Sequence, residues 1–313
     1  MTRMPSDSGT VVVLGTGGTI AGTAASSTSH VGYQAGALSA DELLAAVPAL
    51  QGQQLETEMV ARLDSCDMDH ATWALLAQRV AAHLARPEVR GVVITHGTDT
   101  LEETAYFLHR TVVAAKPVVL TAAMRPATAL SADGPQNLFD AIALAREAGT
   151  SGVLVGFGGR VFGAADVRKV HGYRVDAFDP GDAGALAQFE DGRLRRFRNW
   201  PEGGGDAASL LALPPADWPH VEIVFSHAGT SAALLDAAVR EGARGIVIAG
   251  TGNGTVHANL LAAAHRAGQQ GVRVWRSSRC LLGGVVTGAD EPLPSAGALT
   301  PMQARIALML HLA

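Results

Sequence analysis

The feature that most constrains the fold is the stretch of residues 91–104, which reads GVVITHGTDTLEET. The apolar run VVI is typical of a strand that is buried on both faces of a parallel sheet. A polar turn, HGTD, follows at once, and LEET then begins a helical pattern. In an open α/β sheet such a junction lies at the carboxyl edge of the strands, where ligands bind and where the helix N-terminus favours an anion. Thr98 and Asp99 would therefore suit a small zwitterion, with backbone N–H groups facing its carboxylate and Asp99 facing its ammonium.

The same pair has a plainer interpretation, in which Thr98 caps the helix and Asp99 lies favourably at its positive end. For one such pair alone we favour the plainer interpretation. Similar polar groups at other strand ends change this balance.

A second apolar run, residues 10–14 (TVVVL), leads into the glycine-rich segment GTGGTIAG. This segment is not a dinucleotide fingerprint, because Ile20 stands where glycine is needed, and it lacks the Gly-Lys-Ser/Thr of a P-loop. We therefore expect a backbone that closely approaches a ligand and presents the Thr19 hydroxyl at the same sheet edge.

Two further segments add candidate groups. Residues 22–36 are small and polar except for Tyr33, and we interpret them as a lid that carries Tyr33 over the site. The alternative is a surface loop with an incidental tyrosine. The strand expected at 55–63 ends near Ser65, so that a third strand end carries a small polar group. The alternative is that Ser65 is a simple helix cap.

Lys169 follows the strand expected at 152–157. A lysine at such a place is usually a solvated surface charge. If it is buried beside Thr98 and Asp99, its pKa could instead be lowered and it could act as a base.

The alternation of apolar strands with helical segments predicts an α/β protein of two domains. Residues 1–198 would form a larger, catalytic N-terminal domain around an open, parallel-type sheet. Residues 199–219, rich in Pro and Gly, would be a linker, and residues 220–313 would form a smaller C-terminal α/β domain.

Composition narrows the function classes. A net charge of −5 and a pI near 6.1 argue against nucleic acid as a partner. No stretch is long and apolar enough to span a membrane, and no signal-peptide pattern is present. We therefore expect a cytoplasmic protein, with a periplasmic mature form as the alternative.

Neither a metal nor a cofactor is expected. The eleven histidines show no spacing typical of a metal site, and two cysteines cannot form a four-cysteine zinc site. His96, within the central motif, is expected to be a structural hydrogen-bonding residue rather than a catalytic one.

Several motifs together point to a family. TGGTIAG, DSCDM, THGTDTLEETAYFL, AMRPATALSADGPQN and DVRK occur in this order, followed by AGTGNG, RSSR and ALTPMQAR. In this the sequence resembles the bacterial L-asparaginase (asparaginase–glutaminase) family over nearly its whole length. The resemblance implies an amidohydrolase that converts L-asparagine to L-aspartate and ammonia through a threonine nucleophile and an acyl-enzyme, with weaker activity on L-glutamine. It also implies a homotetramer built as a dimer of dimers.

The resemblance also implies catalytic roles. Thr19 would attack the side-chain amide carbon, and Tyr33 would hydrogen-bond Thr19 and help to manage its proton. Thr98 and Lys169 would form a second, base-like pair, and Asp99 would bind the α-ammonium. Which threonine attacks first is left open.

Binding roles follow in the same way. Ser65 would hold the α-carboxylate, and the carbonyl of Ala123 would orient the amide nitrogen. Backbone N–H groups around Gly18 and Thr98 could stabilise the oxyanion.

Three positions depart from the family pattern. Cys66 stands where the family commonly has glutamine, so the amino-acid end of the substrate would be held less tightly and the preference between asparagine and glutamine is open. Thr255 stands where Asn or Ser often reaches the substrate. Glu291, with Asp290 as the fallback, is the candidate for an acidic residue supplied to the neighbouring subunit's site.

Two alternatives are kept. An amidotransferase-type subunit would use the same domain, although the chain has no added domain and no basic face for tRNA. A two-domain amino-acid-binding protein would need Asp99 and Ser65, but it would have no use for Thr19, Tyr33 and Lys169 together.

Overall fold

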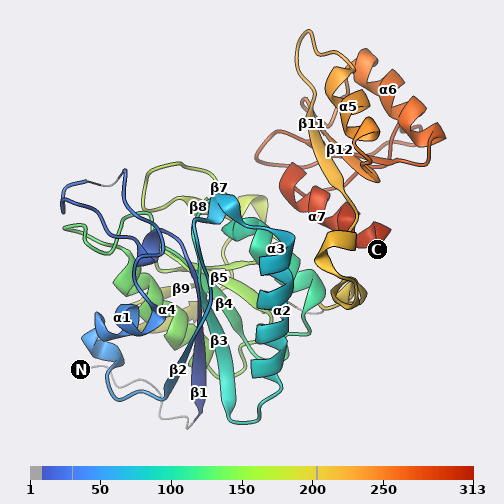
Figure 1. Cartoon of the computed structure of the whole chain (residues 1–313). Helices are drawn as coiled ribbons and strands as arrows, with labels where there is room; N and C mark the ends of the chain where they lie inside the picture. The colour runs from blue at the N-terminus through green and yellow to red at the C-terminus, as the bar shows by residue number, and fades with distance from the viewer. Residues whose placement is uncertain (1–8, 30, 202–203) are drawn as a thin grey trace. The chain divides into compact units, whose positions relative to one another are not determined.

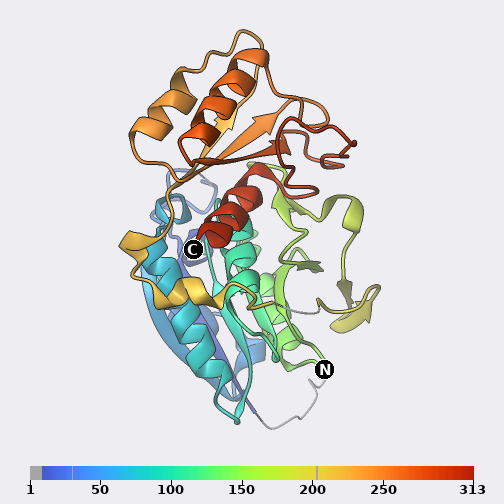
Figure 2. The ribbon, with the colours of Figure 1, turned by 90° about the vertical axis from the view of Figure 1, so that its right-hand side faces the viewer.

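The structure is a computed structural model that describes residues 9–29, 31–201 and 204–313 (Figures 1 and 2). The chain divides into two compact units, Met1–Ala208 and Ser209–Ala313. The division falls within residues 199–219.

The N-terminal unit is built on one eight-stranded sheet with the order β10-β9-β6-β5-β4-β3-β1-β2. Five neighbouring strands are parallel, which confirms the predicted parallel-type sheet, and three antiparallel strands extend it. The parallel strands are β1 (Thr10–Gly17), β2 (Leu55–Leu63), β3 (Val89–Thr95), β4 (Val118–Thr121) and β5 (Val153–Phe157). The antiparallel strands are β6 (Arg160–Gly163), β9 (Ala187–Glu190) and β10 (Arg193–Arg196).

Helices cover both faces of this sheet (Figure 1). On one face α1 (Ala40–Ala45) and α4 (Gly134–Arg146) pack on a core that includes Val93 and Leu138. On the other face lie α2 (His70–Leu84) and α3 (Leu101–Thr111), joined by the stacked rings of Trp73 and Phe107. Because both faces are covered, Val92, Val93 and Ile94 are all fully buried, which explains their unbroken apolar run.

The strand order places the ligand-binding edge. From β1 the chain passes to β2 on one side and then returns to β3 on the other, so the order of the parallel strands reverses between β1 and β3. Ligands in open α/β sheets bind at the carboxyl ends of the two strands that flank such a reversal. Residues 18–19 and 96–99 follow the ends of β1 and β3 at this point.

Side-chain hydrogen bonds cap the starts of α1 and α2. Ser39 and Glu42 form a capping box at α1. Asp69 caps α2 through a 2.7 Å bond from the N–H of Thr72, so Ser65 is not the cap of that helix. The N-cap of α3 is Thr100, without a side-chain bond to the helix, so Thr98 does not cap it either.

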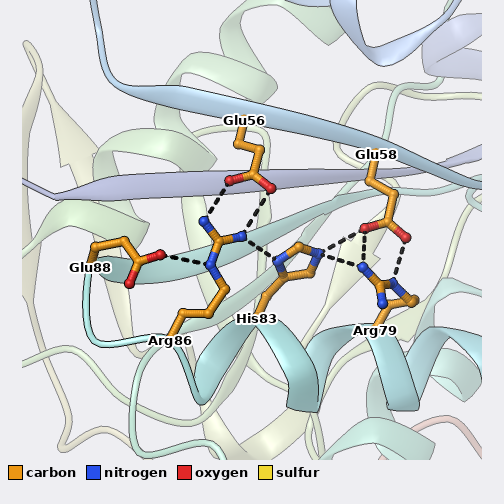
Figure 3. A network of polar contacts seen from close by, with 6 residues as sticks. All are labelled: Glu56, Glu58, Arg79, His83, Arg86 and Glu88. Atoms are coloured by element: carbon orange, nitrogen blue, oxygen red, sulfur yellow. Dashed lines mark hydrogen bonds and ion pairs between the residues drawn. The ribbon is translucent and has the colours of Figure 1, made fainter.

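A network of six side chains joins the edge strand β2 to α2 and the start of β3 (Figure 3). Arg86 makes a fork with Glu56, with an Nη2–Oε2 distance of 2.8 Å, and Arg79 makes a second fork with Glu58, with an Nε–Oε1 distance of 2.6 Å. His83 lies between the two forks, with Nε2 2.8 Å from Glu58 Oε2. Charged side chains along an edge strand oppose pairing with another sheet.

The other edge strand, β10, is also charged. It forms a hairpin with β9 through Asp191 and Gly192, which both have positive φ, as a two-residue hairpin turn requires. Arg193, Arg195 and Arg196 on β10 are exposed. The β9–β10 hairpin is therefore a solvated basic ribbon.

The C-terminal unit has a three-stranded parallel sheet, β11-β12-β13. Its strands are β11 (Val221–Phe225), β12 (Gly245–Gly250) and β13 (Arg273–Ser278), and its helices are α5 (Ala233–Arg240), α6 (Ala258–Gln269) and α7 (Pro301–Leu312). α5 and α6 share a core with one face of the sheet, and α7 packs on the other (Figure 2). Thr300 and Gln303 form the capping box of α7. Across the described ranges of the chain, every helix is too short or too polar to cross a membrane.

Candidate active site

Glycines bring the ends of β1, β2 and β3 into direct contact. Gly18 has a φ of 78°, and a Cβ there would collide with the backbone of Gly97. A Cβ on Gly97 would collide with the side chain of Ser65. Only glycine allows these three loops to approach so closely, which is the physical reason for the motifs TGGTI and THGTD.

The first catalytic candidate, Thr19, lies in a short 3₁₀ turn after β1 and is 4% exposed. Its Oγ1 is 2.5 Å from the hydroxyl of Tyr33. Residues 23 and 34 pair as an isolated bridge, through Thr23 N–H to Gln34 O at 3.1 Å and Gln34 N–H to Thr23 O at 2.9 Å. The chain therefore runs away from Thr19 and comes back, which places Tyr33 beside Thr19.

Burial raises the pKa of Tyr33 above its ordinary value, and the carboxylates of Asp64 and Asp99 raise it further, while the hydrogen bond with Thr19 lowers it. In this state Tyr33 therefore keeps its phenolic proton at neutral pH. A positive charge near Asp99 would reduce the repulsion that opposes the phenolate.

The second candidate group joins Thr98, Asp99 and Lys169. The Nζ of Lys169 donates to Thr98 Oγ1 at 2.9 Å and lies 2.6 Å from Asp99 Oδ1. Thr98 is 5% exposed and the Lys169 side chain 17%, whereas the Asp99 side chain is 53% exposed. Lys169 is therefore not a solvated surface charge, and Asp99 can still reach a ligand.

Ser65 follows β2 in a 3₁₀ turn and is 1% exposed. Its Oγ accepts a hydrogen bond from the N–H of Asp99 at 3.1 Å, and its carbonyl accepts one from Thr100 Oγ1 at 2.7 Å. Ser65 thus joins the end of β2 to the start of α3. Its bond with Asp99 brings together the two residues that are expected to hold an amino acid.

Cys66, next to Ser65, is exposed and free. Partial desolvation raises the pKa of its thiol, and the carboxylates of Asp64, Asp67 and Asp99 raise it further. The thiol therefore remains protonated at neutral pH and offers a ligand only a weak hydrogen bond.

Ala123 is fully buried after β4. The peptides on both sides of it are held: Asn137 Nδ2 donates to Ala122 O at 2.9 Å, and the N–H of Met124 donates to Asp133 Oδ2 at 2.9 Å. The Ala123 carbonyl is therefore set in a rigid turn.

The C-terminal unit, Ser209–Ala313, contains Thr255, Glu291 and Asp290. Thr255 is exposed and closes a turn with Thr251, with N–H to O distances of 2.8 and 2.9 Å. Glu291 accepts hydrogen bonds from the N–H of Gly288 and from the buried guanidinium of Arg276, and both lower its pKa. Their expected roles stay predictions.

Two features of the site were not predicted. The first is Glu102, which accepts a hydrogen bond from the backbone N–H of Lys169. Burial raises the pKa of Glu102 to about 7. The pair Glu102-Glu103 in the first turn of the helix was visible in the sequence, but acidic residues are common there and carry no sign of a distant partner.

The second is a buried chain of hydrogen bonds under the central motif. Trp73 Nε1 donates to Thr104 Oγ1 at 2.9 Å, Thr104 Oγ1 lies 3.0 Å from His96 Nε2, and His96 Nδ1 lies 2.7 Å from Gly97 O. Because a carbonyl can only accept, Nδ1 carries the proton and Nε2 accepts from Thr104. Burial lowers the pKa of His96 to about 4, so the ring is neutral and structural, as expected.

Within the described residues, no three His, Cys, Asp or Glu side chains are grouped so that they could hold a metal ion. The cluster of Thr19, Tyr33, Thr98, Asp99 and Lys169 offers hydroxyl, carboxylate and ammonium groups. Two threonines, each bonded to a group that can exchange a proton, lie at the ends of adjacent strands.

Comparisons with known proteins identify relatives of the chain. The family model described as "Asparaginase, N-terminal" matches residues 10–202, and the "Glutaminase/Asparaginase C-terminal domain" matches residues 220–313. The chain is 39% identical over 308 residues to L-asparaginase 2 of Bacillus subtilis (strain 168), covering 96% of this chain and 81% of that protein. It is 37% identical over 316 residues to a glutaminase-asparaginase of Pseudomonas fluorescens biotype A, covering 96% and 86%.

A solved structure is also similar. The crystal structure of a probable cytoplasmic L-asparaginase from Campylobacter jejuni superposes with a TM-score of 0.92 at 39% identity, covering 97% of this chain and 95% of that one.

Proposed function

The chain belongs to the asparaginase family, and from this premise we propose that it hydrolyses the side-chain amide of L-asparagine to L-aspartate and ammonia. The observation that carries the proposal is the pair of threonine hydroxyls at the reversal of strand order. Thr19 is bonded to Tyr33, and Thr98 is bonded to Lys169. A binding protein would have no need for either pair.

In the proposed first step, Thr19 Oγ1 attacks the amide carbon. A threonine hydroxyl is a weak nucleophile unless a neighbouring group takes its proton, and Tyr33 is the group in contact. The proton then passes to the leaving nitrogen, the C–N bond breaks, and ammonia leaves behind an ester between the β-carboxyl of aspartate and Thr19. Water hydrolyses this ester in the second step.

Substrate binding would itself help to activate Tyr33. Asp99 is one of the carboxylates that raise the pKa of Tyr33, and Asp99 is proposed to bind the α-ammonium of the substrate. The ammonium would partly cancel the negative charge, lower the cost of a phenolate and so favour proton transfer from Thr19. An amide without an α-ammonium would lose this help.

Lys169 would act on the other side of the substrate. Its ammonium bonds Thr98 Oγ1 and Asp99, so it can orient Thr98 and offset charge as the oxyanion forms. Backbone N–H groups near Gly18 and Thr98 are proposed to bind that oxyanion. The alternative order, with Thr98 attacking first, would place the ester on Thr98.

The rest of the substrate would be held by Ser65 at the α-carboxylate and by the carbonyl of Ala123 at the amide nitrogen. With Cys66 next to Ser65, the substrate would be bound less tightly than with a longer hydrogen-bonding side chain at that position. L-Glutamine, one methylene longer, is the second candidate substrate, since similar proteins are named glutaminase-asparaginases.

Assembly and location complete the proposal. We propose a homotetramer formed as a dimer of dimers, in which Glu291 of one subunit reaches the neighbouring site, and we place the protein in the cytoplasm, where two free cysteines would stay reduced. Light scattering of the purified protein and cell fractionation test these two statements.

The function is tested by measuring ammonia release with L-asparagine and L-glutamine in parallel, for the wild type and for Thr19→Ala. We expect saturable release from asparagine by the wild type and a loss of several orders of magnitude in the variant. Mass spectrometry after an acid quench should find the aspartyl ester on the peptide that contains Thr19. Unchanged turnover in Thr19→Ala would refute the assigned nucleophile, and binding without any turnover by the wild type would indicate a binding protein.

A further inference from the structure

We infer that Glu102 is a positioning residue of this site: its carboxylate holds the backbone of Lys169 and thereby sets the lysine ammonium between Thr98 and Asp99. The catalytic consequence rests on the proposed function. The contact itself does not.

Lys169 comes from a segment that has little structure of its own. It lies in β7 (Arg168–Lys169), which pairs with β8 (Phe178–Asp179) in a two-stranded sheet that is separate from the eight-stranded one. A sheet of two such short strands is barely stable alone. Bonds between β7 and residues 98–102, which lead into and begin α3, therefore help to fix the position of Lys169 relative to Thr98.

Three such bonds are present. The backbone N–H of Lys169 donates to Glu102, and its Nζ bonds Thr98 Oγ1 at 2.9 Å and Asp99 Oδ1 at 2.6 Å. Asp99 and Glu102 are three residues apart, at the N-terminus of α3, where the positive end of the helix favours carboxylates. Residues 98–102, which lead into and begin α3, thus bind Lys169 at both its main chain and its side chain.

The charges around Glu102 make this contact sensitive to pH. Burial is the main cause that raises its pKa to about 7, and Glu103 raises it too, while the N–H of Lys169 and the charges of Arg168 and Lys169 lower it. A hydrogen bond to a carboxylate is about twice as strong as one to a neutral acceptor. Protonation of Glu102 near neutral pH should therefore weaken its hold on the Lys169 N–H.

Glutamine and alanine at position 102 separate the charge from the contact. Glu102→Gln keeps an acceptor for the Lys169 N–H but removes the charge, whereas Glu102→Ala removes both. Since a misplacement of about 1 Å can cost about 10²-fold in rate, we expect kcat to fall by about 10²-fold in Glu102→Ala and by roughly tenfold or less in Glu102→Gln, with a much smaller change in KM. Glu103→Gln, next in the same helical turn, is the matched control and should keep kcat within about twofold.

A measurement that does not depend on activity is available because the sequence contains just two lysines, Lys116 and Lys169. A protein labelled with ¹⁵N-lysine should therefore show two backbone amide signals. We expect the Lys169 amide to shift with pH in the wild type, with a midpoint near 7, while the Lys116 amide does not follow it. Glu102→Gln should abolish this titration and leave the Lys116 signal unchanged.

The outcomes are separable. A Lys169 amide that ignores both pH and Glu102→Gln would overturn the inference, as would a Glu102→Ala variant with wild-type kcat. If the wild type releases no ammonia from asparagine, the proposed function fails while the NMR titration still decides the contact. If Glu102→Ala does not fold, Glu102→Gln and the titration still decide it.

Discussion

Replacing Thr104 by valine would test the buried hydrogen bonds beneath the site. Valine has nearly the shape of threonine, so the change removes one hydroxyl and leaves the packing. That hydroxyl accepts from Trp73 Nε1 at 2.9 Å and donates to His96 Nε2 at 3.0 Å. Both partners are buried, at 3% and 0% exposure, so water cannot replace it.

The size of the effect follows from what is left unpaired. Thr104→Val takes the Thr104 hydroxyl away from the donor of Trp73 and the acceptor of His96. Each buried polar group that is left unsatisfied costs about 1–3 kcal/mol. Allowing for relaxation, we expect a loss of about 3 kcal/mol in the free energy of unfolding. Thr111→Val is the matched control, because Thr111 lies in the same helix, is 2% exposed and donates only to the helical carbonyl of Phe107 at 2.8 Å. That carbonyl keeps its main-chain partner, so we expect a loss below about 1 kcal/mol.

Urea unfolding, monitored by tryptophan fluorescence, measures the free energy of unfolding of the wild type, Thr104→Val and Thr111→Val at the same subunit concentration. The urea midpoint should fall clearly only for Thr104→Val. Ammonia release below the unfolding transition should also fall in that variant, since His96 would hold Gly97, the residue before Thr98, less firmly. Equal losses of stability in Thr104→Val and Thr111→Val would refute the reasoning. Both variants replace a buried hydroxyl by a methyl group, and they differ in which buried groups lose a hydrogen-bond partner.

Three further variants have defined outcomes. Tyr33→Phe removes the hydroxyl that lies 2.5 Å from Thr19 and should lower kcat by about 10²–10⁴-fold without changing the unfolding temperature; a kcat within tenfold of the wild type would exclude Tyr33 from proton transfer. Cys66→Gln should lower KM for asparagine, and an unchanged KM would count against a role for this position. Burial raises the pKa of Asp140 from 3.8 to about 6, so its charge costs no stability below the unfolded pKa, costs more as pH rises through that range, and has its full cost above it. Asp140→Asn, which can keep the bond from Gln136, should therefore be more stable than the wild type at pH 8, by on the order of 1–3 kcal/mol, and this gain in thermal unfolding should fall below about 1 kcal/mol at pH 4.

Much of the architecture could be predicted from local patterns. Continuous apolar runs identified β1, β3, β4 and β5, because strands covered by helices on both faces need apolar side chains at every position. The capping boxes at Ser39 and Thr300 marked the starts of two helices, because these pairs satisfy N–H groups within four residues.

The candidate site could be predicted in part for the same reason. Strand ends in a parallel sheet share one edge, so Thr19, Ser65 and Thr98 could be expected near each other before any contact was known. The choice between a site and simple helix caps was not decided by pattern. It needed the positions of Asp69 and Thr100, which lie at the N-caps in place of Ser65 and Thr98.

The sequence by itself therefore determined the elements, the sheet edge and the chemical types of the groups, since these follow from short-range periodicity and from backbone satisfaction within a few residues. The tertiary structure alone decided which groups meet: Lys169 with Thr98 across 71 residues, its backbone with Glu102 across 67, and Trp73 with Thr104 across 31. It also decided that three antiparallel strands extend the parallel sheet. Such contacts depend on how the chain returns to the same place in space, and no local pattern in the sequence records that path.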